Sequence, residues 1–133
     1  VDTPSGLIVP VLKHVDKLTL FEIGRDLRVL AQKTRDRKVT PEDLSGASMT
    51  LSNLGGIGGT HFTPIVNWPE VAILGMGRTE IKPLYIDGKF VPRSVSGLCL
   101  SYDHRVIDGA DGARFIMYLK DTLENMERTL LGR

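Results

Sequence analysis

Cysteine is almost absent from this sequence, since Cys99 is the only one among 133 residues. A single thiol excludes a disulfide within the chain, and it leaves no cysteine cluster for structural zinc. Cys99 lies between Leu98 and Leu100 in an apolar run, so we expect it to be a buried strand residue. This cysteine usage is consistent with a reducing compartment.

A strong charge of one sign is also lacking. The 17 basic and 16 acidic side chains leave a formal net charge of +1, which gives no reason to expect nucleic acid or a membrane as a partner. No apolar run reaches the length of a transmembrane helix. The first residues lack the features of a signal peptide, and there is no starting methionine. We therefore expect a fragment or a processed piece of a longer protein.

Several common catalytic and binding motifs are missing. The three histidines, His14, His61 and His104, are not at metal-ligand spacing, so no metal site is expected. The glycine-rich run Gly55–Gly59 is not followed by Lys and Ser or Thr, as a nucleotide-binding P-loop would be. The sequence has no Gly-x-Ser-x-Gly nucleophile motif.

The first third of the chain predicts a strand and a helix. The β-branched run Leu7–Leu12 predicts a buried strand, with a break or an edge at Pro10. Thr19 and Glu22 have the spacing of a capping box at a helix start. Four apolar residues then recur at helical spacing and predict one buried face: Leu20, Ile23, Leu27 and Leu30. A basic cluster closes this helix, and Thr40-Pro41 starts a second, short one.

The remainder predicts strands followed by a helix. We expect strands over 47–52, 71–76 and 94–102, with a glycine loop over 53–60. Asp87-Gly88 between two apolar runs predicts a two-residue hairpin turn. From Gly109 to the end the pattern is helical, with a shared face formed by Phe115, Leu119, Leu123, Met126 and Leu130. Because the strands are mostly joined without helices between them, the predicted class is α+β, a two-layer sandwich of a mixed sheet and helices.

The segment Ser101–Gly109 lies where the last predicted strand gives way to the last helix. Side chains at such a junction can project into a cleft while the scaffold holds them in place. Asp108 is well placed to cap the helix whatever else it does. Taken alone, His104 is more often a hydrogen-bonded structural histidine than a catalytic base.

The run Asp103–Gly109 resembles the His-x-x-x-Asp-Gly signature of the dihydrolipoamide acyltransferases of 2-oxoacid dehydrogenase complexes and of chloramphenicol acetyltransferase. Met49–Gly55 resembles the serine-bearing strand of the first family. Further segments follow in that family's order over essentially the whole chain: 1–11, 58–67 and 69–75. The resemblance implies a chloramphenicol acetyltransferase-like fold. It also implies that residues 1–133 form the C-terminal part of a catalytic domain about twice as long, without lipoyl or subunit-binding domains.

The resemblance implies thioester exchange, in which an acyl group on dihydrolipoamide passes to coenzyme A. A thiol is mostly protonated at neutral pH, so a base is needed, and His104 matches the family's general base. Ser52 matches the family's donor to the carbonyl oxygen that becomes negatively charged. Asp108 matches a position that supports the local structure of the site, and we do not expect a catalytic triad. The residues that bind coenzyme A are not predicted. No metal is implied, and Phe62 is interpreted as a packing residue.

The resemblance also implies partners. Family members form homotrimers whose active sites take the histidine from one chain and the serine from the next, and the trimers assemble into a large core. The lipoyl group is carried on a separate domain, and the other dehydrogenase subunits bind the same complex. Such a protein is expected in the bacterial cytoplasm or the mitochondrial matrix.

The segment 58–67 looks most like that of acetyl-transferring members, which predicts a pyruvate dehydrogenase-type acetyltransferase. Three alternatives remain open at this point. One is a branched-chain or other 2-oxoacid dehydrogenase acyltransferase. Another is a non-catalytic core-assembly fragment, and the third is a free-standing acetyltransferase of the chloramphenicol type. The isolated piece is predicted to be inactive or nearly so.

Overall fold

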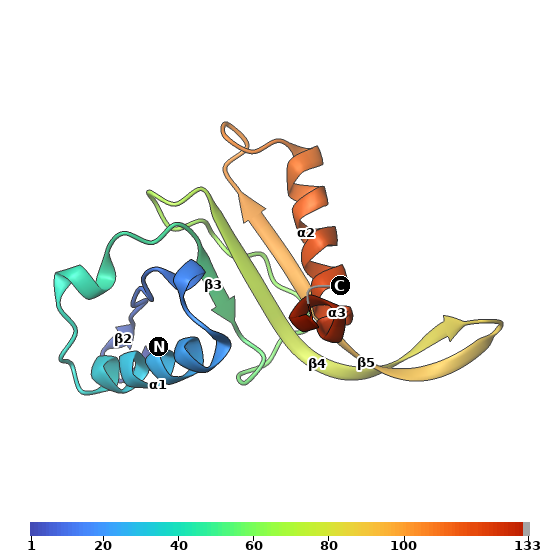
Figure 1. Ribbon diagram of the computed structural model, residues 1–133, viewed down its shortest axis with the longest axis horizontal. Helices are drawn as coiled ribbons and strands as arrows, with labels where there is room; N and C mark the ends of the chain where they lie inside the picture. Colours follow the sequence, from blue (N-terminus) through green and yellow to red (C-terminus); the bar gives the residue numbers. More distant parts are fainter. Residues whose placement is uncertain (132–133) are drawn as a thin grey trace. The chain divides into compact units, whose positions relative to one another are not determined.

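The computed structural model describes residues 1–131 and divides them into two compact units, 1–48 and the part from Met49 onward. The first unit contains a short antiparallel pair, β1 (Asp2–Thr3) and β2 (Gly6–Leu7). It continues with the 3-10 turn η1 (Val15–Lys17), the helix α1 (Leu20–Arg35) and the 3-10 turn η2 (Pro41–Leu44). Figure 1 shows α1 as the long helix of this unit.

The predicted strand over Leu7–Leu12 is wrong for most of its length. Strand β2 ends at Leu7, whose side chain is 74% exposed rather than buried. Pro10 has no backbone N–H to donate to a neighbouring strand, so the ladder cannot continue through it. The next residue, Val11, instead donates its N–H to the carbonyl oxygen of Asp43 at 2.7 Å.

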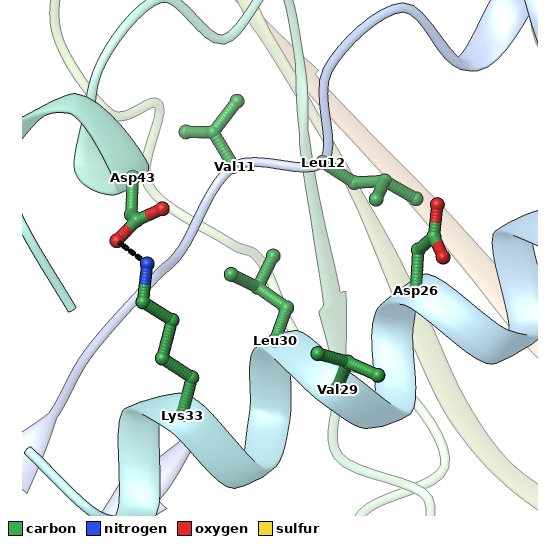
Figure 2. Close-up of a pocket in the computed structure, with 7 residues that line it drawn as sticks. All are labelled: Val11, Leu12, Asp26, Val29, Leu30, Lys33 and Asp43. Atoms are coloured by element: carbon green, nitrogen blue, oxygen red, sulfur yellow. Dashed lines mark hydrogen bonds and ion pairs between the residues drawn. The ribbon is translucent and has the colours of Figure 1, made fainter. Parts of the chain in front are cut away.

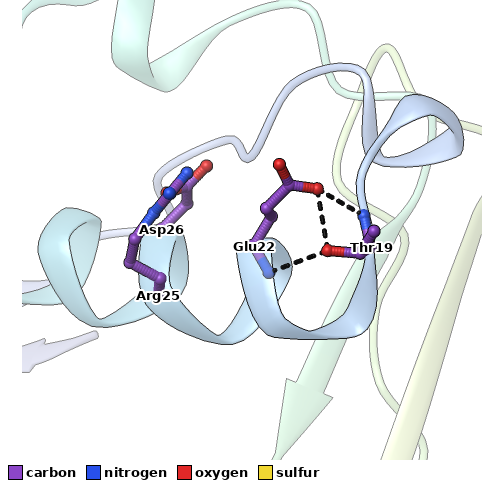
Figure 3. Close-up of polar contacts among 4 residues, drawn as sticks. All are labelled: Thr19, Glu22, Arg25 and Asp26. Carbon is purple, nitrogen blue, oxygen red and sulfur yellow. Dashed lines mark hydrogen bonds and ion pairs between the residues drawn. The ribbon is translucent and has the colours of Figure 1, made fainter.

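The predicted start of α1 is confirmed (Figure 3). The Glu22 N–H donates to Thr19 Oγ1 at 3.3 Å, and the Thr19 N–H donates to Glu22 Oε2 at 2.8 Å, so both halves of the capping box form. The bond from the Thr19 N–H has the largest effect on the Glu22 carboxylate, and the Thr19 hydroxyl also donates to Glu22 Oε2 at 2.8 Å; both hold the pKa of Glu22 below its ordinary value. The predicted apolar face is only partly buried, because Leu20 and Leu27 are 64% and 50% exposed.

The second unit is built on a three-stranded mixed sheet. Its strands are β3 (Thr50–Asn53), β4 (Ala72–Ile86) and β5 (Lys89–Tyr102), in the order β3-β4-β5. Strand β3 runs parallel to β4, and β5 runs antiparallel to it. Helices α2 (Gly109–Glu124) and α3 (Met126–Leu131) follow, and α2 lies alongside β5 (Figure 1). This arrangement confirms the predicted α+β class.

Strands β4 and β5 are longer than predicted, because β4 continues through a register shift between Met76 and Thr79 and both strands stay paired as far as the hairpin turn. They run on past α2 as a long hairpin (Figure 1). Its turn is the predicted pair Asp87-Gly88, with φ of 49° and 78°. Two consecutive positive φ angles are the geometry that lets a two-residue turn follow the twist of the strands.

The final helical region is broken once. Asn125 separates α2 from α3, and both its N–H and its side-chain amide donate to the carbonyl oxygen of Asp121, at 3.0 Å and 2.9 Å. A side chain that bonds to the backbone in this way ends a helix rather than continuing it, so the predicted continuous helix is wrong here. The end of that predicted helix, 132–133, lies outside the described residues.

Few apolar side chains are buried in the described part of the chain. The buried hydrophobic residues are Ile73 and Leu74, each 6% exposed, in the central strand β4. Cys99 lies in β5 as predicted but is half-buried rather than buried. Among residues 1–131, no helix has the length and hydrophobicity required to cross a membrane.

Candidate functional site

Ser52 lies in β3, at the edge of the sheet. It is paired with Gly75 of β4, which is in turn paired with Cys99 of β5. Paired residues on neighbouring strands project to the same face, so Ser52 and the Gly75 Cα share one face of the sheet. The Ser52 side chain is half-buried, and within residues 1–131 its hydroxyl makes no hydrogen bond. The hydroxyl is therefore free to donate to another group.

Glycines on this face allow the segment after the glycine loop to cross the sheet closely. A Cβ atom on Gly75 would lie 2.8 Å from Cζ of Phe62. Cβ atoms on Gly77 and Gly97 would lie 2.1 Å and 2.4 Å from the carbonyl oxygen of Thr60. Larger residues would displace the crossing segment. The glycines therefore allow the Phe62 ring to lie over Gly75, the strand partner of Ser52. Sequence reasoning assigned Phe62 to packing and did not place it beside the candidate serine.

His104 lies in a tight turn just beyond the end of β5. The Asp103 N–H donates to the Val71 carbonyl oxygen at 2.8 Å, which ties the turn to the start of β4. Val106 and Ile107 both donate their N–H groups to the Asp103 carbonyl oxygen at 3.0 Å. The His104 side chain is exposed. Its ring centroid is 5.7 Å from that of Tyr102, with 44° between the ring planes.

Asp103 and Arg105, the two neighbours of His104, form an ion pair with each other. Arg105 donates from Nη2 to Asp103 Oδ2 at 2.6 Å and from Nε to Oδ1 at 3.0 Å. Hydrogen bonding to Arg105 lowers the pKa of the Asp103 carboxyl to about 2. A two-point contact of this kind fixes the orientation of both side chains. The residues directly before and after His104 are therefore fixed by this ion pair.

Asp108 caps α2, as the sequence predicted. Its Oδ1 accepts from the Asp111 N–H at 2.8 Å, and its carbonyl oxygen accepts from the Gly112 N–H at 3.0 Å. These bonds satisfy N–H groups at the helix start that have no partner within the helix. In the described residues, no hydrogen bond joins Asp108 to His104. The structure therefore shows Asp108 as the cap of α2, and the hydrogen bonds of a Ser-His-Asp triad are not formed among the described residues.

Ser52 and His104 are not brought together within one chain. Ser52 is level with Gly75, whereas Tyr102, two residues before His104, is level with Ala72. Three residues along the sheet and two strands across it correspond to about 14 Å between the Cα atoms of Ser52 and Tyr102. The strand register of one chain therefore keeps the strand position of Ser52 well apart from the end of β5, after which His104 lies.

The first unit has a separate hollow of about 250 Å³ (Figure 2). Lys33 of α1 donates to Asp43 Oδ2 at 2.5 Å across it, and Thr40 donates its N–H to the same oxygen at 2.7 Å. These contacts hold the pKa of Asp43 below its usual range, and the hydrogen bond from Lys33 has the largest effect. The other lining residues are Val11, Leu12, Asp26, Val29 and Leu30. The sequence did not single out this hollow, and it contains no predicted site residue.

Comparison with known proteins decides the family. Residues 1–131 match the model of the 2-oxoacid dehydrogenases acyltransferase catalytic domain. This chain belongs to that family. It is 50% identical, over 131 residues, to the dihydrolipoyllysine-residue acetyltransferase component of the pyruvate dehydrogenase complex of Haemophilus influenzae. The match covers 98% of this chain and 23% of the relative.

Solved structures confirm the predicted chloramphenicol acetyltransferase-like fold. The chain is 49% identical to dihydrolipoamide acetyltransferase of Azotobacter vinelandii, with a TM-score of 0.93. It is 48% identical to a chain of the cubic core of a pyruvate dehydrogenase multienzyme complex, with the same TM-score. Each match covers 98% of this chain and 54% of the other. The chain thus spans about half of these solved chains.

The Azotobacter enzyme provides a direct comparison of spacing. Its serine, its histidine 52 residues later and its asparagine four residues beyond that have been investigated for their roles in its catalytic mechanism. Ser52, His104 and Asp108 have the same two intervals, with aspartate in place of asparagine. The predicted residues therefore fall on the same spacing as the residues studied in that relative.

Proposed function

We propose that the protein containing this chain is an acetyltransferase that moves an acetyl group between dihydrolipoamide and coenzyme A in a pyruvate dehydrogenase-type complex. The single observation that carries the proposal is the matching spacing of Ser52, His104 and Asp108 in a chain that belongs to the acyltransferase family. The names of close relatives support the same reaction.

His104 is proposed as the general base. It takes the proton from the coenzyme A thiol, and the resulting thiolate forms a bond to the carbonyl carbon of the acetyl thioester. The bond from this carbon to the lipoamide sulfur then breaks, and the protonated imidazole returns its proton to that sulfur. The exposed position of His104 at the end of β5 supports this role, because both thiols must reach it.

Ser52 is proposed to stabilise the transition state. Attack on the carbonyl carbon places negative charge on its oxygen, and the free Ser52 hydroxyl can donate to that oxygen. A donor of this kind typically contributes about 10²–10³ in rate. Asp108 contributes by capping α2, the helix that begins directly after the His104 turn.

The distance between Ser52 and His104 within one chain supports an active site formed between subunits. We propose a homotrimer, with His104 from one copy facing Ser52 of the next, and further assembly into a large core. A solved relative forms the cubic core of a pyruvate dehydrogenase complex. Separate lipoyl domains would deliver the acetyl group, and the other dehydrogenase subunits would bind the same core. We propose that the protein works in the bacterial cytoplasm or the mitochondrial matrix.

Acetyl transfer is proposed over transfer of branched acyl groups because of Phe62. Its ring lies over Gly75, the strand neighbour of Ser52, and so beside the place where the acyl carbonyl would lie. An aromatic ring there leaves less space than a small side chain would. A branched-chain acyltransferase would need this space for two additional methyl groups.

The test is acetyl transfer from acetyl-coenzyme A to dihydrolipoamide by the full-length protein. We expect His104→Asn to lower kcat by at least about 10²-fold, because the basic nitrogen of the proposed proton acceptor is lost. His14→Asn is the matched control, since His14 is an exposed histidine of the other unit and Asn tolerates its φ of 54°. Activity retained by His104→Asn would overturn the proposal.

A non-catalytic role in core assembly is the second candidate, and the scarcity of buried apolar side chains in the described residues favours it. It predicts a full-length protein that forms a core of normal size without acetyl transfer. Turnover that depends on His104 would exclude it.

A further inference from the structure

We propose that Tyr102 is a positioning residue for His104. Its ring packs against α2, so the position of this helix determines where the imidazole lies. This inference rests on the proposed function of His104. Tyr102 is the last residue of β5, and its ring lies close both to Gly112 of α2 and to the ring of the proposed base.

The contact with His104 is the first observation. The ring centroids are 5.7 Å apart and the planes are tilted by 44°, which is within the range of contacting aromatic rings. In residues 1–131 no hydrogen bond to the His104 imidazole is found. Asp103 and Arg105 form an ion pair with each other and do not bond to the imidazole. The Tyr102 ring is therefore the side chain that defines one boundary of the space available to His104.

The contact with α2 is the second observation. Gly112 is the buried residue of α2. A Cβ atom on Gly112 would lie 2.7 Å from Cε1 and 3.1 Å from Cζ of Tyr102, closer than carbon atoms normally approach. Only glycine therefore lets the helix meet this edge of the ring without moving it. The Asp108 cap fixes the start of the same helix, so the cap, Gly112, Tyr102 and His104 form one continuous chain of contacts.

The test measures kcat and KM of full-length variants in acetyl transfer. Tyr102→Leu removes the ring and is expected to lower kcat about 10- to 100-fold, because displacing a reacting group by about 1 Å has an effect of that size. KM for both thiol substrates should change less than about threefold, because Tyr102 acts through His104 and does not bind substrate. Tyr102→Phe keeps the ring and should keep kcat within about twofold of the native value.

Gly112→Ala provides an independent route to the same effect. The added methyl group would displace the Tyr102 ring, so kcat should fall as it does in Tyr102→Leu. In the double variant, Gly112→Ala should cause little further loss, because the ring that it displaces is absent. Tyr85→Leu and Gly24→Ala are matched controls. Tyr85 lies in the exposed hairpin, and a Cβ on Gly24 of α1 meets nothing within 4 Å.

The outcomes separate this inference from the proposed function. If His104→Asn abolishes transfer but Tyr102→Leu and Gly112→Ala keep the native kcat, the positioning role is wrong and the function stands. If Tyr102→Phe loses as much kcat as Tyr102→Leu, or if the double variant loses the product of the two single effects, the role of the ring is also overturned. If Tyr102→Leu does not assemble, Gly112→Ala decides: a native kcat overturns the inference. Activity in His104→Asn removes both proposals.

Discussion

Ser52 and His104 lie in the same unit of the chain, yet an entire strand, β4, separates β3, which carries Ser52, from β5, after which His104 lies. Ser52 is three residues inside the end of the sheet, and His104 extends beyond that end. Neither side chain has a hydrogen-bonded partner among residues 1–131. Both side chains are therefore free to bond to other groups, as the proposed site between two copies requires.

A mixing experiment tests this arrangement. Full-length Ser52→Ala and His104→Ala proteins should each be nearly inactive. When equal amounts are dissociated and reassembled into trimers, random assembly gives intact His104–Ser52 pairs at about a quarter of the interfaces. We therefore expect recovery of about a quarter of the native acetyl transfer.

A site contained in one chain makes the opposite prediction, because every chain in the mixture lacks one of its two groups. No recovery after verified reassembly would show that Ser52 and His104 act within one chain. The control is each variant dissociated and reassembled alone, which should stay inactive.

Phe62→Ala should change the acyl preference. Removing the ring beside Ser52 creates space for a branched acyl group, and each methylene group in such a pocket contributes about 1–3 kcal/mol. We expect the ratio of kcat/KM for isobutyryl over acetyl transfer to rise at least about tenfold. Competition between the two acyl-coenzyme A substrates measures this ratio directly.

Phe115→Ala, an aromatic truncation in α2, is the matched control for that experiment and should leave the ratio unchanged. An unchanged ratio in Phe62→Ala would show that the acyl group is bound elsewhere.

The Asp103–Arg105 ion pair should contribute to stability in a pH-dependent way. Arg105 lowers the pKa of Asp103 from 3.8 to about 2. Because the folded-state pKa is the lower one, the contribution is fully present above about pH 3.8 and is lost as the pH falls through about 2. Arg105→Gln should therefore be less stable than the native protein near neutral pH, with a difference that shrinks over this acid window.

Urea unfolding at several pH values measures that difference. Arg114→Gln is the control, since Arg114 pairs with Asp111 on the exposed face of α2. A difference that stays constant from pH 5 to pH 2 would show that the ion pair does not contribute in this way.

Asp108 should tolerate asparagine but not alanine. Both Asp and Asn can accept the Asp111 N–H that caps α2, whereas Ala cannot, and loss of a cap typically costs about 1 kcal/mol. Asp108→Asn should keep near-native unfolding free energy and acetyl transfer. Asp108→Ala should lose stability by about that amount, as measured by chemical unfolding. A larger loss of activity in Asp108→Asn than in Asp108→Ala would instead indicate that the charge takes part in the reaction.

Local sequence signals predicted the parts of the structure that depend on neighbouring residues. The capping box of Thr19 and Glu22, the turn at Asp87-Gly88 and the cap at Asp108 all form as expected. Each of these depends on hydrogen bonds or φ angles within a few residues, so the chain elsewhere has little influence on them.

Features that depend on distant residues could not be predicted in this way. The extent of β4 and β5 depends on pairing across the hairpin, and the bulge near Met76 has no local signal. The position of Phe62 over Gly75 depends on a loop that crosses the sheet. His104 and Ser52 were identified by resemblance alone, which also implied that they come from different chains. The distance between their strand positions within one chain follows from the strand register.

The scarcity of buried apolar side chains has a consequence for handling this protein. Phe21, Ile65 and Trp68 are 92%, 89% and 87% exposed, so large apolar groups stay in contact with water unless other protein covers them. Where a second copy covers them, as in the proposed trimer, burial releases free energy at roughly 25 cal/mol per Å² of apolar surface, and this gain exists only while the copies are associated. Dilution should therefore destabilise the protein, and its melting temperature should fall as the protein concentration is lowered.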